Sequence, residues 1–372
     1  MIYTSIVLTI FLFFSFFNKD GLYLFGLLSL VTPMFFIFLF NIYKKWGVVL
    51  DKKNAYTIIP LFLLSLCYLL WSASSENPII SIQRGFLIII YVMFFLFYFN
   101  IGLIDKQEKF IFPVSVFALL LSLVILVNIN SVLQQWNPNV VGIYLSMLFL
   151  LIFLSLNGVV WKFVFFVLGV CVILLTDSRT SFLAYLSATL FYMFSHIIYR
   201  NRVIYYSVFF ILIGFAGMVI YITISEQLYI FLEYSQKISS KNIESGRNVI
   251  WSIVYDYISD RPMLGHGGGI MLSNLYNIEL SAHNLYLQIA LQVGIIGLSL
   301  LIIFYLLLWR RGWQLYKIYN RLEMKKSGAI FVWLLMIQNF EITLFQNNII
   351  LSLPIFAIMS YYMGVSSIKR DF

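Results

Sequence analysis

The strongest constraint in this sequence is a series of long apolar stretches separated by short polar breaks. A membrane-crossing helix needs about 20 mostly apolar residues to span a hydrocarbon core of roughly 30 Å, and these stretches are close to that length. They lie near residues 2–17, 22–43, 55–71, 85–104, 110–127, 141–156, 159–176, 180–199, 203–224, 283–309, 328–346 and 347–364. We therefore expect an all-α integral membrane protein, a polytopic bundle of about twelve transmembrane helices that forms a single domain over residues 1–372.

The composition excludes the other classes of protein. Hydrophobic residues make up 62% of the chain and charged residues only 10%, whereas a soluble domain has about 25% charged residues. The strands of an outer-membrane barrel alternate apolar and polar residues, but Phe35–Phe40 and Phe94–Phe99 are apolar at every position. Cys67 and Cys171 lie inside apolar stretches, so we expect small buried side chains and neither a disulfide framework nor a metal site.

The distribution of lysine and arginine predicts the orientation in the membrane. If the amino terminus is cytoplasmic, seventeen of the 24 basic residues fall on the cytoplasmic side, as the positive-inside rule requires. These are Lys44, Lys45, Lys52, Lys53, Lys106, Lys109, Lys162, Arg200, Arg202, Arg310, Arg311, Lys317, Arg321, Lys325, Lys326, Lys369 and Arg370. We expect both termini to be cytoplasmic. The net charge of +9 is thereby explained by the membrane, with no nucleic-acid partner.

Residues 225–282 form the one long polar segment, and the same count of crossings places it on the outer side, between the ninth and tenth spans. Apolar residues recur in it at helical spacing, which predicts an amphipathic helix over about 247–260. Arg261-Pro262 should end that helix, and the glycine-rich string 265–269 is typical of a turn. We expect this large helical loop to cover a site at the outer membrane surface.

Four arginines lie at the outer boundary, where the orientation signal disfavours them. Arg261 stands beside Asp260 and before a proline, so we expect a structural role for it; the other three are Arg84, Arg179 and Arg247. A guanidinium stays charged and offers a planar fork of donors that suits phosphate oxygens, so two or more together would bind a diphosphate. The alternative is local pairing, of Arg179 with Asp177 and of Arg247 with Glu244, or contact with lipid head groups.

His283 and Asn284 begin the tenth apolar stretch, and Gly294 and Gly297 follow about three helical turns deeper. An imidazole has an ordinary pKa of about 6.5, so it can accept a proton from a sugar hydroxyl near neutral pH. A single histidine in such a place is also often a structural hydrogen-bonding group. Both interpretations of His283 stay open from the sequence.

Glu341 lies in the eleventh apolar stretch, beside Gln338 and Asn339. A carboxylate within a membrane span is a candidate functional residue, because it is costly to hold there. Proton coupling in a transporter and a hydrogen-bonded contact between helices are both compatible with it.

The string from His283 to Gly297, with its histidine-asparagine pair and two glycines, resembles the signature of the O-antigen ligase and O-antigen polymerase superfamily. Upstream, 178–180 is similar to that family's arginine hinge, 245–247 to the start of its periplasmic helix and 262–267 to the turn that follows. The motifs occur in the family's order over roughly residues 170–300.

This resemblance implies a glycosyltransferase of the bacterial inner membrane with its active site on the periplasmic side. The donor would be a glycan linked to undecaprenyl diphosphate, and the reaction would invert the anomeric centre without a metal or other cofactor. Arg179 and Arg247 would hold the diphosphate, with Arg84 as a further candidate. His283 would activate the acceptor hydroxyl, and Asn284 and Glu341 would line the site.

Three functions remain open from the sequence. A polymerase, which we favour, extends one lipid-linked repeat unit with another, and its candidate partner is a chain-length regulator, whereas a ligase transfers the polymer to lipid A core. The loop strings 245–247 and 262–267 look more like those of polymerases. A secondary transporter or flippase for a lipid-linked or anionic substrate is the third possibility, but the internal repeats typical of such proteins are not found.

Overall fold

The computed structural model describes residues 52–104, 111–224, 247–270, 272, 282–319, 322–342, 344 and 349–367. All regular structure in these ranges is helical. The expected spans over 2–17 and 22–43 lie outside the described residues, as does most of the polar stretch before residue 247. The expected number of twelve spans therefore stays a prediction.

The other ten expected spans each correspond to a helix, and the expected loop helix over 247–260 is present with those bounds. Five helices are long and apolar enough to cross a membrane, which confirms a multi-pass helical membrane protein. The helices are α3 (Lys52–Leu70), η1 (Trp71–Ser74), α4 (Pro78–Ile104), α5 (Ile111–Val127), α6 (Ile129–Gln135), α7 (Pro138–Ser155), α8 (Val159–Leu174), α9 (Arg179–Arg200), α10 (Arg202–Ile224), α12 (Arg247–Asp260), α14 (Leu285–Tyr319), α15 (Leu322–Gln338) and α16 (Ile349–Ser366).

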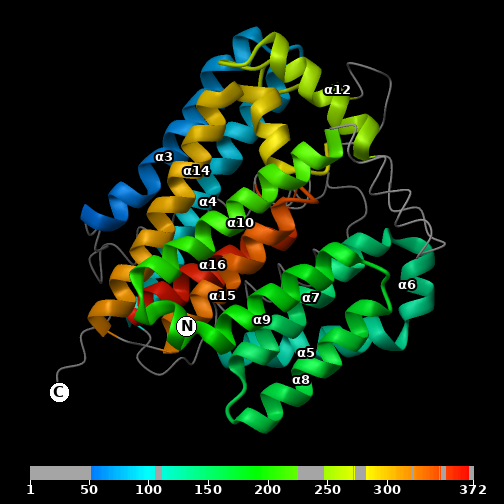
Figure 1. The fold of residues 1–372 in the computed structure, drawn as a ribbon, viewed down its shortest axis with the longest axis vertical. Helices are drawn as coiled ribbons and strands as arrows, with labels where there is room; N and C mark the ends of the chain where they lie inside the picture. Colours follow the sequence, from blue (N-terminus) through cyan, green and yellow to red (C-terminus); the bar gives the residue numbers. More distant parts are fainter. Residues whose placement is uncertain are drawn as a thin grey trace.

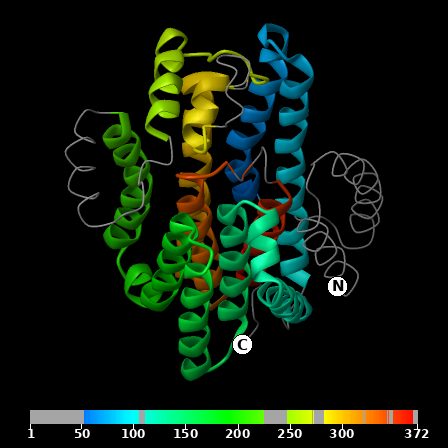
Figure 2. The same cartoon turned by 90° about the vertical axis from the view of Figure 1, so that its right-hand side faces the viewer.

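The helices form two groups joined through α15 and α16 (Figure 1). One group contains α3, α4 and α14, and the other contains α5 and α7 to α9 (Figure 2). Glycines allow α4 and α16 to pack closely, since a Cβ on Gly102 would lie 2.2 Å from the carbonyl oxygen of Tyr361, and one on Gly364 would lie 2.0 Å from that of Phe99. Small residues commonly allow such close approach between membrane helices.

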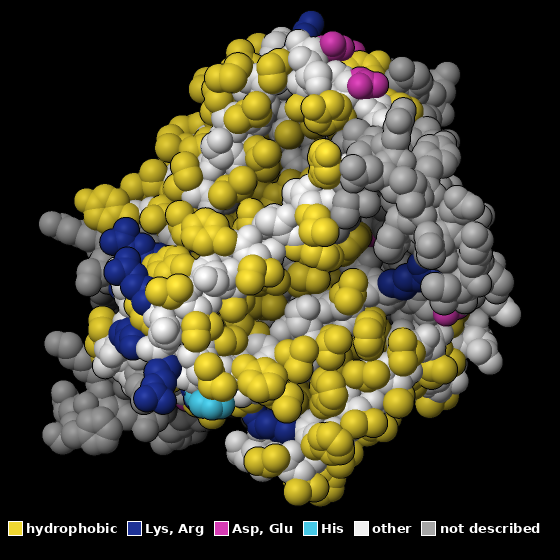
Figure 3. Space-filling model, viewed as in Figure 1, with side chains coloured by type: hydrophobic (Ala, Val, Ile, Leu, Met, Phe, Trp, Pro, Cys, Tyr) yellow, Lys and Arg dark blue, Asp and Glu magenta, His cyan; other side chains and the backbone are white. Residues whose placement is uncertain are grey.

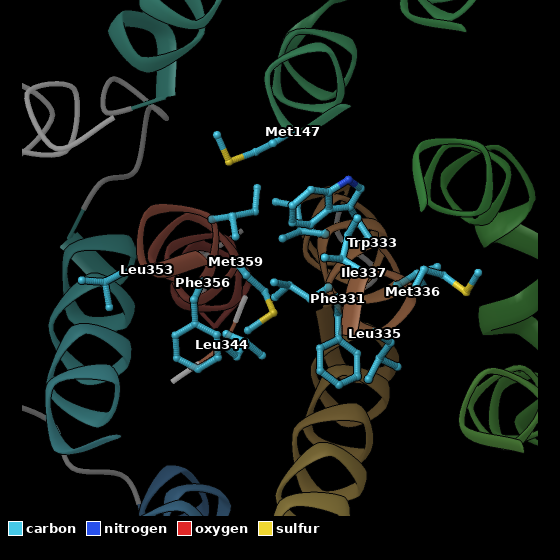
Figure 4. Packing of buried hydrophobic residues seen from close by; sticks show 14 of the residues in the cluster. Met147, Phe331, Trp333, Leu335, Met336, Ile337, Leu344, Leu353, Phe356 and Met359 are labelled. Carbon is cyan, nitrogen blue, oxygen red and sulfur yellow. The ribbon is translucent and has the colours of Figure 1, made fainter. Parts of the chain in front are cut away.

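The hydrophobic core is centred on α15, which is buried on every side from Lys326 to Gln338. Figure 4 shows α15 and α16 at the middle of the packing, with Met147 of α7 across from Trp333. The indole N–H of Trp333 donates to Oγ of Ser146 at 3.1 Å, so the one polar atom of this side chain is paired. A helix surrounded in this way has no lipid-facing side, and its ends are fixed by the helices around it.

α14 is not one straight helix. Val293 and Gly294 have non-helical dihedral angles, with φ of −126° and +69°. The first part of α14 (yellow) meets the remainder near the top of Figure 1, so the chain changes direction at the break. The expected single span over 283–309 is wrong in this respect, because the left-handed conformation at Gly294 interrupts it.

The turn over 261–267 supplies the hydrogen-bonding partners that the break removes. In an unbroken helix the N–H of Ile295 would donate to the carbonyl oxygen of Leu291. Here the N–H of Ile295 donates to the carbonyl oxygen of Pro262, and the carbonyl oxygen of Leu291 accepts from the N–H of His266, both at 2.8 Å. The expected glycine-rich turn is thus confirmed, and it supplies hydrogen-bonding partners to the backbone on both sides of the break in α14.

We predict that Gly294→Ala destabilises the protein. A Cβ there would lie 2.1 Å from the carbonyl oxygen of Met263, and φ of +69° adds strain of about 1–3 kcal/mol for a residue with a side chain. The measurement is the melting temperature of the purified protein in detergent. Gly214→Ala is the matched control, because a Cβ at Gly214 in α10 meets no atom within 4 Å. Equal melting temperatures for the two variants would contradict the assigned break.

Candidate functional site

The centre of the candidate site is a hydrogen bond between His283 and Glu341. The N–H at Nδ1 of His283 donates to Oε2 of Glu341 at 3.0 Å. The imidazole side chain is 29% exposed and the carboxylate side chain only 9%, so the ring can be reached from outside while its partner is enclosed. Because Nδ1 is engaged, Nε2 is the ring nitrogen left to meet a substrate.

Glu341 is positioned by the end of α15. That helix stops at Gln338, and the backbone N–H of Glu341 still donates to the carbonyl oxygen of Ile337 at 2.9 Å. The expectation that Glu341 lies within the eleventh span is therefore wrong, since it lies in non-helical chain directly after α15. The side-chain amide of Asn339 donates to the carbonyl oxygen of Leu335, a local bond of the kind that competes with helix continuation.

The second carboxylate oxygen of Glu341 contacts the start of α7. Nδ2 of Asn139 donates to Oε1 of Glu341 at 3.4 Å, so both carboxylate oxygens have a partner. Asn137 caps α7 by accepting from the backbone N–H of Asn139 at 2.9 Å, and Pro138 is the first helical residue. The capped start of α7 thus places Asn139 against Glu341.

Asn284 has a structural position next to His283. Its Oδ1 accepts from the backbone N–H of Leu287 at 3.0 Å, which is the bond of a helix N-cap, and its Nδ2 donates to the carbonyl oxygen of Asn339 at 2.9 Å. The side chain is fully buried. Asn284 therefore ties the start of α14 to the end of α15 and fixes the separation of His283 from Glu341.

The backbone at His283 is in the left-handed region, with φ of +47°. Residues with a side chain seldom adopt this conformation, and such positions cluster at functional sites. Asp177, in the hinge before α9, has φ of +55°. These two are the residues other than glycine with positive φ in the described part of the chain. His283 is itself a candidate site residue, and Asp177 lies two residues before Arg179.

Arg179 is the first residue of α9 and its side chain is exposed. Across the described ranges, its guanidinium has neither a hydrogen bond nor an ion pair, so the alternative of a pair with Asp177 is not seen. Ser178, which precedes it, packs on α7, where a Cβ on Gly142 would lie 2.5 Å from Cβ of Ser178. Gly142 is about one turn from Asn139, so α7 connects Arg179 to the His283–Glu341 pair.

Arg247 is the first residue of α12, and its side chain is outside the described part of the chain. Trp251, one turn later, is buried, and its indole N–H donates to the carbonyl oxygen of Ala282 at 2.7 Å. Ala282 precedes His283. The amino-terminal end of α12 therefore lies about one turn from a direct contact with the His283 segment.

Arg84 has a different place from the one expected. It lies in α4, is 8% exposed, and donates from Nη1 to the carbonyl oxygen of Gly268 at 2.5 Å. Its contact is thus with the glycine-rich turn, which Ser75 also holds by accepting from the N–H of Gly269. Arg84 therefore contacts the turn that supports the break in α14. A separate group, joined by hydrogen bonds and by adjacency in the sequence, contains His283, Asn284, Glu341 and Asn139.

Asn139 is the site residue that the sequence analysis missed. Its signal was the Asn137-Pro138-Asn139 string, which is a helix start with a polar residue in the first turn of an otherwise apolar helix. As for metal ligands, no group of three or more histidine, cysteine, aspartate or glutamate side chains is gathered among the described residues.

A comparison with protein families finds one match. Residues 164–302 match the family model described as O-antigen ligase. The match includes Arg179, the α12 helix, the glycine-rich turn and His283, and it ends before Glu341. No curated protein matches the chain. The match over residues 164–302 supports the resemblance of this chain to the O-antigen ligase and O-antigen polymerase superfamily of membrane enzymes.

Proposed function

We propose that this protein is a glycosyltransferase that polymerises oligosaccharide repeat units carried on undecaprenyl diphosphate, at the periplasmic face of a bacterial inner membrane. The observation that supports it most directly is the His283–Glu341 hydrogen bond of 3.0 Å. Trp251 of α12 contacts Ala282 next to His283, and α7 contacts both Glu341 and Ser178, the residue before Arg179. Transfer of a sugar from a diphosphate to an alcohol requires a base that accepts the proton of the alcohol and cationic groups that stabilise the leaving diphosphate. A histidine held by a carboxylate can be that base.

His283 acts on the acceptor. Glu341 binds the Nδ1 side of the ring, so Nε2 faces the acceptor hydroxyl and takes its proton. The acceptor oxygen forms a bond to the anomeric carbon of the donor sugar, on the face opposite the leaving group. The bond from that carbon to the phosphate oxygen breaks, and its electron pair leaves with the diphosphate. Attack from the opposite face inverts the anomeric centre.

Arg179 and Arg247 act on the donor. Negative charge develops on the diphosphate as the bond breaks, and fixed cations stabilise it without having to reorganise. The exposed guanidinium of Arg179, with no protein partner among the described residues, is suited to this role. Both arginines begin helices, whose unpaired backbone N–H groups also favour anions. We assign Arg84 to support of the glycine-rich turn and not to the phosphates.

Deletion of this chain should distinguish the polymerase from its alternatives. In a bacterium that assembles O-antigen, we expect gels of lipopolysaccharide to show core bearing a single repeat unit, because transfer to core continues without polymerisation. Bare core with accumulated lipid-linked polymer would instead identify a ligase. Repeat units retained on the cytoplasmic side, as shown by labelling in intact cells, would identify a flippase and contradict the enzyme.

We predict that His283→Asn lowers the rate of transfer by about 10²–10⁴-fold, the usual contribution of a general base. Asparagine tolerates the left-handed backbone, so the loss reports the chemistry and not the fold. Glu341→Gln should lower the maximal rate less, with the Michaelis constant for donor unchanged, and Glu341→Asp should restore part of it. The measurement is glycan transfer by purified protein across the pH range of activity.

Glu323→Gln is the matched control for the carboxylate, since Glu323 lies in the first turn of α15, at the opposite end of that helix. Full activity of Glu341→Gln at every pH would remove Glu341 from the mechanism. A collapse of donor affinity in His283→Asn would make the histidine a donor-binding residue instead.

We predict that Arg179→Ala and Arg247→Ala each abolish long glycan ladders while the protein stays in the membrane. Loss of one charge-stabilising donor typically lowers rates by about 10²–10³-fold. Arg200→Ala is the control, because Arg200 ends the same helix that Arg179 begins. The measurement is the ladder on a gel beside an immunoblot of the membrane fraction. Normal ladders from both variants would disprove a diphosphate clamp.

A further inference from the structure

The connection between α5 and α7 is polar but has no charged residue. Of its twelve residues, 128–139, six are amides: Asn128, Asn130, Gln134, Gln135, Asn137 and Asn139. No Lys, Arg, Asp, Glu or His occurs anywhere from 110 to 161. An ordinary soluble domain has about 25% charged residues, so a surface that only has to meet water is usually charged. This connection offers hydrogen-bonding groups without charge instead.

The helix in this connection, α6, turns its polar side away from the protein. Four apolar residues at helical spacing pack against the hydrophobic core, namely Ile129, Val132, Leu133 and Trp136. Asn130, Ser131 and Gln134 are exposed. These three residues form the α6 polar surface. The packing of the apolar side fixes the helix, so the polar surface has a defined direction.

The amides of the α6 polar surface are available to a ligand. Asn130 and Gln134 are four residues apart, so their side chains are neighbours on the helix. Within the described ranges, neither side chain has a hydrogen bond or an ion pair. Each amide offers an acceptor oxygen and two N–H donors, and a hydroxyl group both donates and accepts. Two neighbouring amides can therefore bind adjacent hydroxyl groups of a sugar.

The α6 polar surface is continuous with the candidate site. α6 ends at Gln135, and Asn137 caps α7 two residues later. Asn139, in the first turn of α7, donates to Glu341, which in turn accepts from His283. α6 lies on the right-hand side of Figure 1, whereas most Lys and Arg side chains visible in Figure 3 lie along the opposite edge of the same view. The surface thus adjoins the residue pair that would activate the acceptor.

We propose that the α6 polar surface binds the glycan of the acceptor substrate through the hydroxyl groups of uncharged sugars, an inference that rests on the proposed function. A phosphate or an anionic lipid head group would require cations, and residues 110–161 contain none. A protein partner would require exposed aromatic or apolar anchors, whereas those of α6 face the core. A neutral surface also leaves the donor diphosphate to Arg179 and Arg247, so sugars and phosphates are separated by charge.

The test uses the oligosaccharide that mild acid releases from the lipid-linked repeat units of a bacterium that makes this protein. This probe carries neither lipid nor diphosphate, and its binding to the full-length protein in detergent is titrated by saturation-transfer NMR. We expect Asn130→Ala and Gln134→Ala each to weaken binding by about threefold, and the double variant by about tenfold, as for one and two uncharged hydrogen bonds. Alanine is the strongest helix former, so α6 should keep its fold. Asn157→Ala, exposed beyond the other end of α7, should bind as the wild type does.

In transfer assays, the double variant should raise the Michaelis constant for the acceptor about tenfold, with the maximal rate nearly unchanged, because it loses binding and not chemistry. Equal oligosaccharide binding by the wild type and the double variant, or no binding by the wild type, would overturn the inference. So would a lower maximal rate with an unchanged Michaelis constant, since α6 would then act only through Asn139. Normal transfer by His283→Asn would contradict the proposed base and leave this surface standing, because oligosaccharide binding is measured without transfer.

Discussion

The backbone hydrogen bonds between the glycine-rich turn and the break in α14 are the interaction on which the site depends. Away from water, each unpaired backbone N–H or C=O costs several kcal/mol, roughly, so a membrane helix can break only where other groups replace its lost partners. The turn over 262–267 provides them on both sides of Gly294. Gly265 has φ of +67°, and a Cβ there would lie 2.6 Å from the carbonyl carbon of Gln292, so this close approach requires glycine.

The break determines the place of His283. The change of direction at Gly294 allows the start of α14 to meet the end of α15, where the side chain of Asn284 donates to the carbonyl oxygen of Asn339. Asn284 then joins α14 to α15, and Asn139 joins α7 to Glu341. The enclosed carboxylate is tolerated there because both of its oxygens have partners.

The helices and the individual candidate site residues could be predicted from the sequence, whereas the contacts between those residues could not. Apolar stretches and helical periodicity predicted α12 and the described spans, because those signals are local. The His283–Glu341 contact joins residues 58 positions apart through a break that depends on one dihedral angle. A glycine at 294 is compatible with close helix packing as well as with positive φ, so the sequence alone favoured the straight span. The partner of Arg84 could not be predicted from the sequence either, because it is a backbone oxygen far along the chain.

The glycine-rich turn, α12 and the His283 segment are linked to one another by hydrogen bonds. His266 at the turn contacts the carbonyl oxygen of Tyr257 in α12, and Trp251 of the same helix contacts Ala282 beside His283. A displacement of the amino-terminal end of α12, which carries Arg247, is therefore transmitted to the histidine segment through Trp251 and to the break through the turn.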